Sequence, residues 1–147
     1  MRIKGTNKAD LLQGSVSGDT IDGGRGSDWL DGGAGNDTYT GGLGADKFVL
    51  RSGGGHDVVT DFNPAEGDRV LFDYGTYSDV MFLGSLSDGL TWQNSTHTAT
   101  FTVSAVDYNS DGHTDTLITV DYAGGQDSIA LLGWAPQDLM GWALQGG

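Results

Sequence analysis

The sequence predicts an all-β protein in which a stack of very short strands fills residues 1–50 and antiparallel strands follow over 51–147. The first observation is a nine-residue period, because Gly5 to Val49 divides into five units: GTNKADLLQ, GSVSGDTID, GGRGSDWLD, GGAGNDTYT and GGLGADKFV. The second is that no window of the sequence has helical periodicity. The third is a period-two alternation of apolar and polar residues between Thr98 and Ala105, which is typical of a half-buried strand.

Two places in the unit are fixed. Aspartate stands sixth in every unit (Asp10, Asp19, Asp28, Asp37, Asp46), and an apolar residue stands eighth (Leu12, Ile21, Leu30, Tyr39, Phe48). A unit this small cannot bury its own apolar side chain, so neighbouring units must stack and share a core. Stacking also brings the aspartates together, where their like charges repel. A flexible Gly/Asp-rich linker is the alternative, but a linker has no reason to keep an apolar residue at every eighth place.

The last three units begin with Gly-Gly-x-Gly, which allows a tight turn whose backbone carbonyls point inward. Carbonyl and carboxylate oxygens without nitrogen or sulfur ligands suit a hard divalent cation and favour Ca²⁺ over Mg²⁺. The predicted metal ligands are the five sixth-place aspartates and the turn glycines, through their carbonyls: Gly23, Gly24, Gly26, Gly32, Gly33, Gly35, Gly41, Gly42 and Gly44.

This repeat resembles the calcium-binding nonapeptides of RTX (repeats-in-toxin) proteins. The resemblance implies a right-handed parallel β-roll in which two units make one coil and calcium lies between turns stacked on the same side. It also implies three stacked pairs: Asp10 with Asp28, Asp19 with Asp37, and Asp28 with Asp46. The first two units depart from the pattern at Thr6, Lys8, Ser15 and Ser17. Weaker or incomplete sites are therefore expected there, and the calcium core is expected between Gly23 and Asp46.

The hydrophobic content, the absence of cysteine and the net charge restrict the kinds of site and partner that the chain can have. Only 37% of the 147 residues are hydrophobic and 26 are glycine, so much of the stability must come from outside a core, with bound metal the obvious source. The absence of cysteine excludes disulfides and thiolate metal sites. A net charge of −13 disfavours nucleic acid as a partner. All seven Lys and Arg residues lie at or before Arg69 and look scattered along the chain.

The segment after the repeats reads as a strand (Asp57–Phe62), a turn (Asn63–Asp68) and a returning strand (Arg69–Phe72). Its sequence, HDVVTDFNPAEGDRVLF, resembles the segment that follows the repeats in many RTX proteins. Asp57 follows a glycine run as the repeat aspartates do, so it is a candidate ligand that closes the last calcium turn. The alternative is that Asp57 and Asp61 only cap turns.

Four further strands are predicted, over 80–83, 98–105, 116–122 and 128–132. The connection Asp107–Asp115 has oxygen ligands at places one, three and five (Asp107, Asn109, Asp111), Gly at place six and Asp at place nine. This matches the opening of an EF-hand-like calcium loop, but place twelve is Ile118 and no flanking helices are predicted. An ordinary hairpin connection is the alternative.

The expected location is outside the cell. No amino-terminal signal peptide and no membrane-spanning stretch is evident, which alone would suggest a cytoplasmic protein. However, cytosolic calcium is too scarce to fill weak sites. Residues 133–139 resemble the ending of RTX proteins that type I secretion systems export, so the ABC transporter of such a system is an expected partner.

No catalytic constellation is evident, since the sequence has neither His-Glu-x-x-His nor Gly-x-Ser-x-Gly. We therefore expect a non-catalytic module that folds on binding Ca²⁺ outside the cell and supports secretion and stability of the protein carrying it. The alternative is a polysaccharide-binding module, because alginate epimerases carry RTX modules of similar size and order of parts. With scattered basic residues, a neutral glycan is then the expected ligand, and the outward-facing Trp29 a candidate for sugar stacking. An enzyme with an unrecognised carboxylate site is a third possibility.

Overall fold

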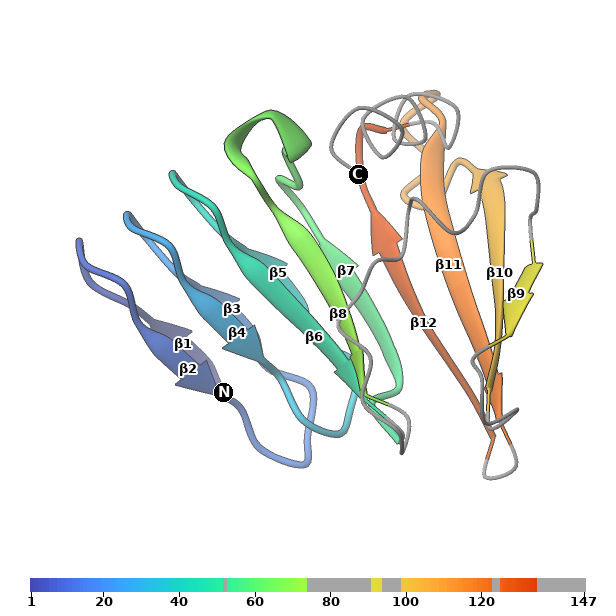
Figure 1. Cartoon of the computed structure of the whole chain (residues 1–147), viewed down its shortest axis with the longest axis horizontal. Helices are drawn as coiled ribbons and strands as arrows, with labels where there is room; N and C mark the ends of the chain where they lie inside the picture. Colours follow the sequence, from blue (N-terminus) through green and yellow to red (C-terminus); the bar gives the residue numbers. More distant parts are fainter. Residues whose placement is uncertain (52, 74–90, 94–98, 123–124, 135–147) are drawn as a thin grey trace.

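A computed structural model describes residues 1–51, 53–73, 91–93, 99–122 and 125–134, which form twelve β-strands and one 3₁₀ turn (Figure 1). The 3₁₀ turn, η1 (Pro64–Glu66), is the only helical segment among these residues. The described part of the chain therefore has no helix that could cross a membrane. The predicted all-β class is confirmed.

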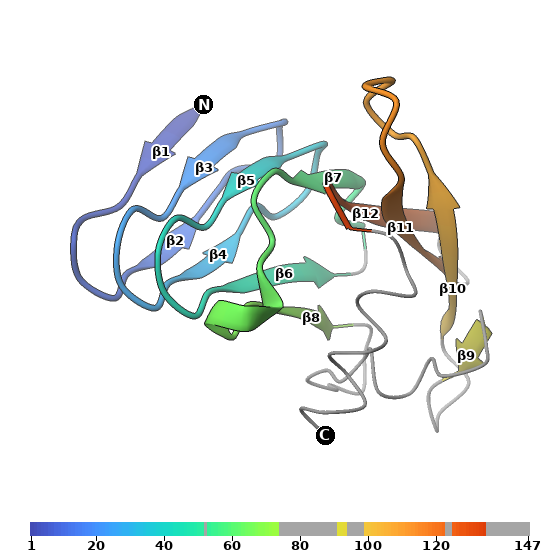
Figure 2. The same ribbon diagram turned by 90° about the horizontal axis from the view of Figure 1, so that it is seen from above.

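The repeats form two facing layers of parallel strands (Figure 2). The chain alternates between the layers, so that each coil contributes one strand to each. Sheet A receives β1 (Arg2–Lys4), β3 (Thr20–Asp22), β5 (Thr38–Thr40) and β7 (His56–Val59). Sheet B consists of β2 (Leu11–Gln13), β4 (Trp29–Asp31), β6 (Lys47–Arg51) and β8 (Arg69–Asp73). All pairs among these eight strands are parallel, which confirms the predicted roll.

The eighth-place residues fill the space between the layers. Ile21, Leu30, Tyr39 and Phe48 are completely buried, whereas Leu12 in the outermost coil is only partly buried. The rings of Tyr39 and Phe48 pack edge to face with their centroids 5.8 Å apart. Larger inward side chains thus occupy the end of the roll nearest the rest of the chain, where they contribute most to a shared core.

The parallel stack continues beyond residue 50, where the sequence placed the boundary of the roll. Strand β7 pairs with β5, and β8 pairs with β6 in parallel, so residues 69–72 do not return antiparallel to residues 57–62 as predicted. Residues 52–60 and 63–71 are two further units, with Asp57 and Asp68 sixth and the buried Val59 and Val70 eighth. Two-residue insertions, at 50–51 and 61–62, break the nine-residue period and conceal these units in the sequence.

Four antiparallel strands extend sheet A past the roll. They run in the order β12 (Gly125–Leu131), β11 (Asp115–Tyr122), β10 (Ala99–Val106) and β9 (Thr91–Gln93), and β12 pairs in parallel with β7. The strands predicted over 98–105, 116–122 and 128–132 correspond to β10, β11 and β12. Strand β9 was not predicted, and the strand predicted over 80–83 lies outside the described residues.

This antiparallel cap shares the hydrophobic core of the roll. Ile118, Val120, Ile129 and Leu131 belong to the same buried cluster as the eighth-place residues. Polar contacts reinforce the junction: the indole N–H of Trp134 donates to the Phe62 carbonyl, and the Thr116 hydroxyl donates to the Trp134 carbonyl at 2.7 Å. The roll and the cap therefore stabilise each other.

Replacing Tyr39 by Phe tests how much the core depends on one buried polar link. The Tyr39 hydroxyl accepts the Gly32 N–H at 2.8 Å and donates to the Val49 carbonyl at 3.3 Å. Removing it leaves a buried donor without a partner, so Tyr39→Phe should lower the free energy of unfolding by about 1–3 kcal/mol. Urea unfolding in saturating calcium measures this change. The exposed Thr20→Ser should stay within about 0.5 kcal/mol of the native chain, and equal stability of both variants would contradict the prediction.

Candidate metal centre

The sixth-place aspartates form two continuous columns. The backbone N–H of each aspartate donates to Oδ1 of the aspartate one coil farther along, at 2.8–2.9 Å. The column in the turns leading into sheet B contains Asp10, Asp28, Asp46 and Asp68, and the column in the turns leading into sheet A contains Asp19, Asp37 and Asp57. The three expected stacked pairs are all adjacent in these columns.

The second carboxylate oxygen distinguishes the inner aspartates from the outer ones. Oδ2 of Asp28, Asp37, Asp46 and Asp57 is buried and has no hydrogen-bond partner. Burying an ionised carboxylate without compensation is very unfavourable, and the group must then bind a proton or a cation. These four oxygens mark the positions in the roll where a bound cation or a proton would supply the missing partner.

At three of the four column ends a local backbone donor occupies Oδ2; the exception is Asp57, whose Oδ2 has no partner. Thr6 donates its N–H to Asp10 Oδ2 and Ser15 donates its N–H to Asp19 Oδ2, both at 2.6 Å. At the other end, Asn63 donates its N–H to Asp68 Oδ2 at 2.8 Å. The first two turns thus satisfy their own carboxylates, which gives a physical reason for expecting weaker sites there.

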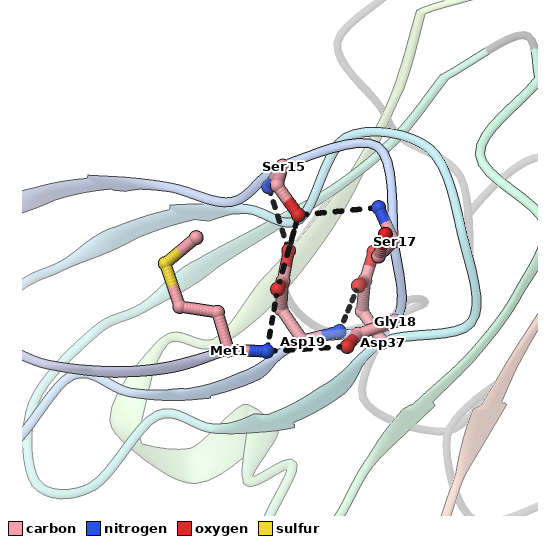
Figure 3. Close-up of polar contacts among 6 residues, drawn as sticks. All are labelled: Met1, Ser15, Ser17, Gly18, Asp19 and Asp37. Atoms are coloured by element: carbon pink, nitrogen blue, oxygen red, sulfur yellow. Dashed lines mark hydrogen bonds and ion pairs between the residues drawn. The ribbon is translucent and has the colours of Figure 1, made fainter.

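Asp19 illustrates this satisfied state (Figure 3). The Ser15 N–H and hydroxyl both donate to its carboxylate, and the Met1 amino group lies 3.0 Å from Oδ1. The backbone hydrogen bond from Ser15, followed by the hydrogen bond from the amino group, lowers the pKa of Asp19 below its ordinary value although burial opposes this. A carboxylate with such donors stays ionised without a metal.

The glycines make room for the inner aspartates. Gly24 and Gly26, at the second and fourth places, have φ values of 90° and 97°, which side-chain-bearing residues rarely adopt. Gly23, at the first place, is needed for space: a Cβ there would lie 2.5 Å from Asp28 Oδ2 and 2.8 Å from the Gly41 carbonyl oxygen of the next coil. A carboxylate oxygen and a carbonyl oxygen thus converge on one point beside this backbone.

This donor set fits calcium. All the groups that converge are oxygens, the carboxylates are buried and unpaired, and the flexible turn imposes no octahedral arrangement. The predicted ligands in units three to five have this arrangement, and Asp57 extends it to the sixth unit. Gly53 and Gly55, which precede Asp57, have the same positive φ as Gly24 and Gly26.

The unpaired carboxylates resist ionisation. Burial, followed by repulsion from neighbouring aspartates, raises the pKa of Asp37 to about 6, of Asp46 to about 7 and of Asp57 to about 8. Burial also raises the pKa of Asp28, and that of Asp68 to about 6. Hydrogen bonds from the backbone oppose each shift without cancelling it. At neutral pH the folded columns must therefore either bind protons or carry charge that the described residues do not compensate.

Three acidic residues beyond the five repeats, Asp57, Asp61 and Asp68, have roles that the sequence left open or missed. Asp61 accepts the N–H groups of Gly41 and Gly42, both at 2.8 Å, so it caps a turn as the alternative proposed. Asp57 has no such donor on Oδ2 and differs from Asp61 in this respect. Asp68 was not among the predicted site residues. The signal that could have found it is the sixth and eighth places of the unit 63–71, once the two-residue insertions are allowed for.

The β10–β11 connection gathers a separate acidic group. Carboxylate oxygens of Asp107, Asp111 and Asp115 lie within 4.8 Å of one another. However, Asp107 accepts the N–H groups of Asp111 and Gly112, and the buried Asp115 accepts those of Tyr108 and Gly133. Asn109 also accepts the Asp111 N–H, at 3.3 Å. These hydrogen bonds suit both a structural turn and a cation loop, so a metal role for Asp107, Asn109 and Asp111 stays a prediction.

Comparison with known proteins identifies the repeats. Residues 13–48 match the family model of the RTX calcium-binding nonapeptide repeat (4 copies). Two solved structures from the Azotobacter vinelandii mannuronan C5-epimerase are similar to the chain. The AlgE6R2 subunit has 29% identity over 95% of this chain and 88% of its own, with a TM-score of 0.49. The AlgE6R3 subunit has 27% identity over 88% and 73%, with a TM-score of 0.30. No curated protein sequence matches the chain significantly.

The raised pKa values predict how pH acts on the calcium-free chain. Folding raises the carboxyl pKa values, so the folded state binds more protons than the unfolded state and loses stability as pH rises. The loss should begin near the ordinary value of 3.8 and continue to about 8, the raised pKa of Asp57. In calcium-free buffers, far-UV circular dichroism should therefore show more β structure at pH 5 than at pH 8. Greater β content at the higher pH would contradict this assignment of charge.

Proposed function

Residues 13–48 belong to the RTX calcium-binding nonapeptide repeats, and we propose that the chain is a non-catalytic module that folds when Ca²⁺ binds outside the cell. Folding there would support type I secretion and the stability of the protein that carries the module. The observation behind this proposal is the set of four buried carboxylate oxygens without partners, at Asp28, Asp37, Asp46 and Asp57. The native arrangement of these residues needs a cation to be stable.

The ion-holding residues follow from the columns. Asp28 and Asp46 hold calcium in the turns leading into sheet B, and Asp37 and Asp57 hold it in the turns leading into sheet A, each with carbonyl oxygens of the adjoining glycine turns. Asp10 and Asp19 contribute more weakly, because Thr6 and Ser15 already donate to them. A bound divalent cation supplies the positive charge that these all-oxygen sites lack.

Folding and ion binding are coupled by electrostatics and chain entropy. Without calcium, the columns place buried like charges one above another, and the glycine turns lose much conformational freedom on folding. The free energy of ion binding therefore becomes free energy of folding. Sites of extracellular modules bind calcium at about 10⁻⁴–10⁻³ M, so they stay empty in the cytosol and fill outside. An unfolded chain is suited to export. We therefore include in the proposal that the ABC transporter of a type I secretion system exports the chain and that the folded module acts outside the cell.

Circular dichroism of the full chain tests the coupling. At neutral pH in calcium-free buffer the far-UV spectrum should be that of coil, because the aspartate columns are charged and repel. Adding calcium to about millimolar concentration should convert it cooperatively to a β spectrum. Magnesium at the same concentration is the control and should be much less effective. A full β spectrum in calcium-free buffer at pH 7 would refute the proposal.

A matched pair of substitutions tests the difference between inner and outer aspartates. Asp37→Asn keeps an oxygen for the Asp19 N–H but removes the charge from a buried carboxylate without a partner on Oδ2. The calcium concentration at half-folding should rise by about tenfold, equivalent to about 1.4 kcal/mol. In calcium-free buffer the same variant should be more folded than the native chain, because a buried charge is gone.

The companion variant Asp10→Asn changes a carboxylate whose Oδ2 already accepts the Thr6 N–H. Its calcium midpoint should shift by less than about threefold, because this half-buried carboxylate already has a local donor and belongs to the outermost coil. Calcium titrations followed by circular dichroism measure both midpoints. Equal shifts in the two variants would show that the unpaired oxygens do not define the sites.

A further inference from the structure

The first six units of the roll each have a backbone N–H at the second place, and they differ in the group that accepts it. In the first unit Thr6 donates this N–H to Asp10 Oδ2 at 2.6 Å. In the second unit Ser15 donates it to Asp19 Oδ2, also at 2.6 Å (Figure 3). The second-place N–H is therefore a local donor that competes with a cation for the sixth-place carboxylate.

In the next four units a carboxylate outside the sixth-place columns accepts this N–H instead, at 2.8–3.1 Å. The donors are the second-place glycines Gly24, Gly33, Gly42 and Gly53. The acceptors, in the same order, are Asp22, Asp31, Asp61 and Asp127. We call these four acceptors the turn-holding aspartates.

The turn-holding aspartates serve the same units that contain the unpaired carboxylate oxygens. Oδ2 has no partner in the sixth-place residues of units three to six, which are Asp28, Asp37, Asp46 and Asp57. Directly before the first two turns stand Lys4 and Gln13, neither of which has a carboxylate, and there the sixth-place Oδ2 is occupied. In these six units, an N–H accepted from outside always accompanies an unpaired oxygen.

The seventh unit agrees with this relation. Its second residue is Pro64, which has no N–H to donate. Its first residue, Asn63, donates to Asp68 Oδ2 at 2.8 Å instead. The sixth-place oxygen is again occupied in a unit that has no second-place N–H held from outside.

The acceptor of the N–H also determines where a carbonyl points, because the N–H and C=O groups of one trans peptide point in opposite directions. In the first unit the Thr6 N–H points at Asp10, so the carbonyl of the same peptide points away from that carboxylate. In the third unit Asp22 holds the Gly24 N–H, and the carbonyl of that peptide is turned away from Asp22. Gly24 permits this orientation with a φ of 90°, and the carboxylate stabilises it.

The turn-holding aspartates come from different parts of the chain. Asp22 and Asp31 stand directly before the turns that they hold. The turns of units five and six have no acidic residue at this place, and Asp61 and Asp127 supply the carboxylate from 19 and 74 residues beyond the donor. Asp127 lies on β12 of the cap and is only 2% exposed. The same contact made by separate routes indicates that the turn requires it.

We propose that the turn-holding aspartates determine which turns of the roll bind calcium, as positioning residues that are not themselves ligands. Each accepts the second-place N–H and so leaves Oδ2 of the sixth-place aspartate free for the cation. This role rests on the proposed function, because the sites concerned are the calcium sites assigned there. Without the acceptor, the N–H turns to Oδ2, as it does in units one and two.

Substitutions at Asp22 test this role in the full chain, with calcium titrations followed by circular dichroism. Asp22→Ala removes the acceptor of the Gly24 N–H, which then competes for Asp28 Oδ2. The calcium concentration at half-folding should rise by about tenfold or more, as for other groups that orient metal ligands. Asp22→Asn keeps an oxygen for the N–H and should stay within about threefold of the native midpoint. Equal losses in the two variants would overturn the proposal, because charge or direct ligation would then matter instead.

The number of ions bound to the folded chain separates positioning from a role in turn stability alone. Equilibrium dialysis of folded Asp22→Ala should count about one calcium ion fewer than the native chain, because a freed oxygen has been lost. A turn-stability role would raise the midpoint but leave the ion count of the folded chain unchanged, which would overturn the proposal. Asp61→Ala repeats both measurements at a turn held from outside, and it decides the matter if Asp22→Ala does not fold.

Asp121→Ala is the matched control, because it removes one exposed carboxylate that accepts only a side-chain amide in the cap, from Gln126 at 2.7 Å. Its calcium midpoint should stay within about twofold of the native value. Equal midpoints of Asp121→Ala and Asp22→Ala would overturn the proposal while leaving calcium-coupled folding intact. A native chain that does not fold with calcium would instead refute the proposed function itself.

Discussion

The constraint on which the rest of the structure depends is a set of buried aspartate oxygens that have no hydrogen-bond partner. A nine-residue period places one aspartate per turn, and parallel stacking then sets each aspartate against the next at strand spacing. Backbone N–H groups satisfy one oxygen of each carboxylate, while the other oxygen of Asp28, Asp37, Asp46 and Asp57 faces no donor. The core between two layers of strands three to five residues long is small, and under the proposed function bound cations supply the missing compensation.

The sequence predicted the positions of side chains best at the sixth and eighth places of the unit, where the same type of residue recurs in every repeat. The eighth-place residues could be predicted from the period, because it determines which side chains face inward, whereas the aspartate pairs followed from the family resemblance, in which two units make one coil. The sixth and seventh units were missed because Leu50-Arg51 and Asp61-Phe62 shift the period by two residues each. Asp68 was missed for the same reason. The parallel pairing of β12 with β7 could not be predicted either, since the two strands lie about seventy residues apart and their alternation does not specify a partner.

The two columns end differently, and this links calcium to the cap. The column of Asp10, Asp28, Asp46 and Asp68 ends on the Asn63 N–H, which is a purely local contact. The other column ends at Asp57 with an oxygen that has no donor, on the strand to which the cap is attached. Adjacent contacts on that strand include the Gly55 N–H to Asp127 and His56 Nδ1 to Ser128. A cation held by Asp57 would therefore stabilise the edge on which the cap docks, so the cap is expected to order together with the roll.

The coil separates three tasks among three neighbouring places. The sixth place faces the turn and its charge, the eighth fills the core, and the seventh between them points outward with neither duty. Substitution at the seventh place should therefore change ion binding and packing little, and this place holds residues of different kinds: leucine, tryptophan, lysine and arginine on sheet B, and arginine, threonine and valine on sheet A. The charge of the turn, the packing of the core and the exposed surface are thus assigned to three successive residues, so each can change with little effect on the other two.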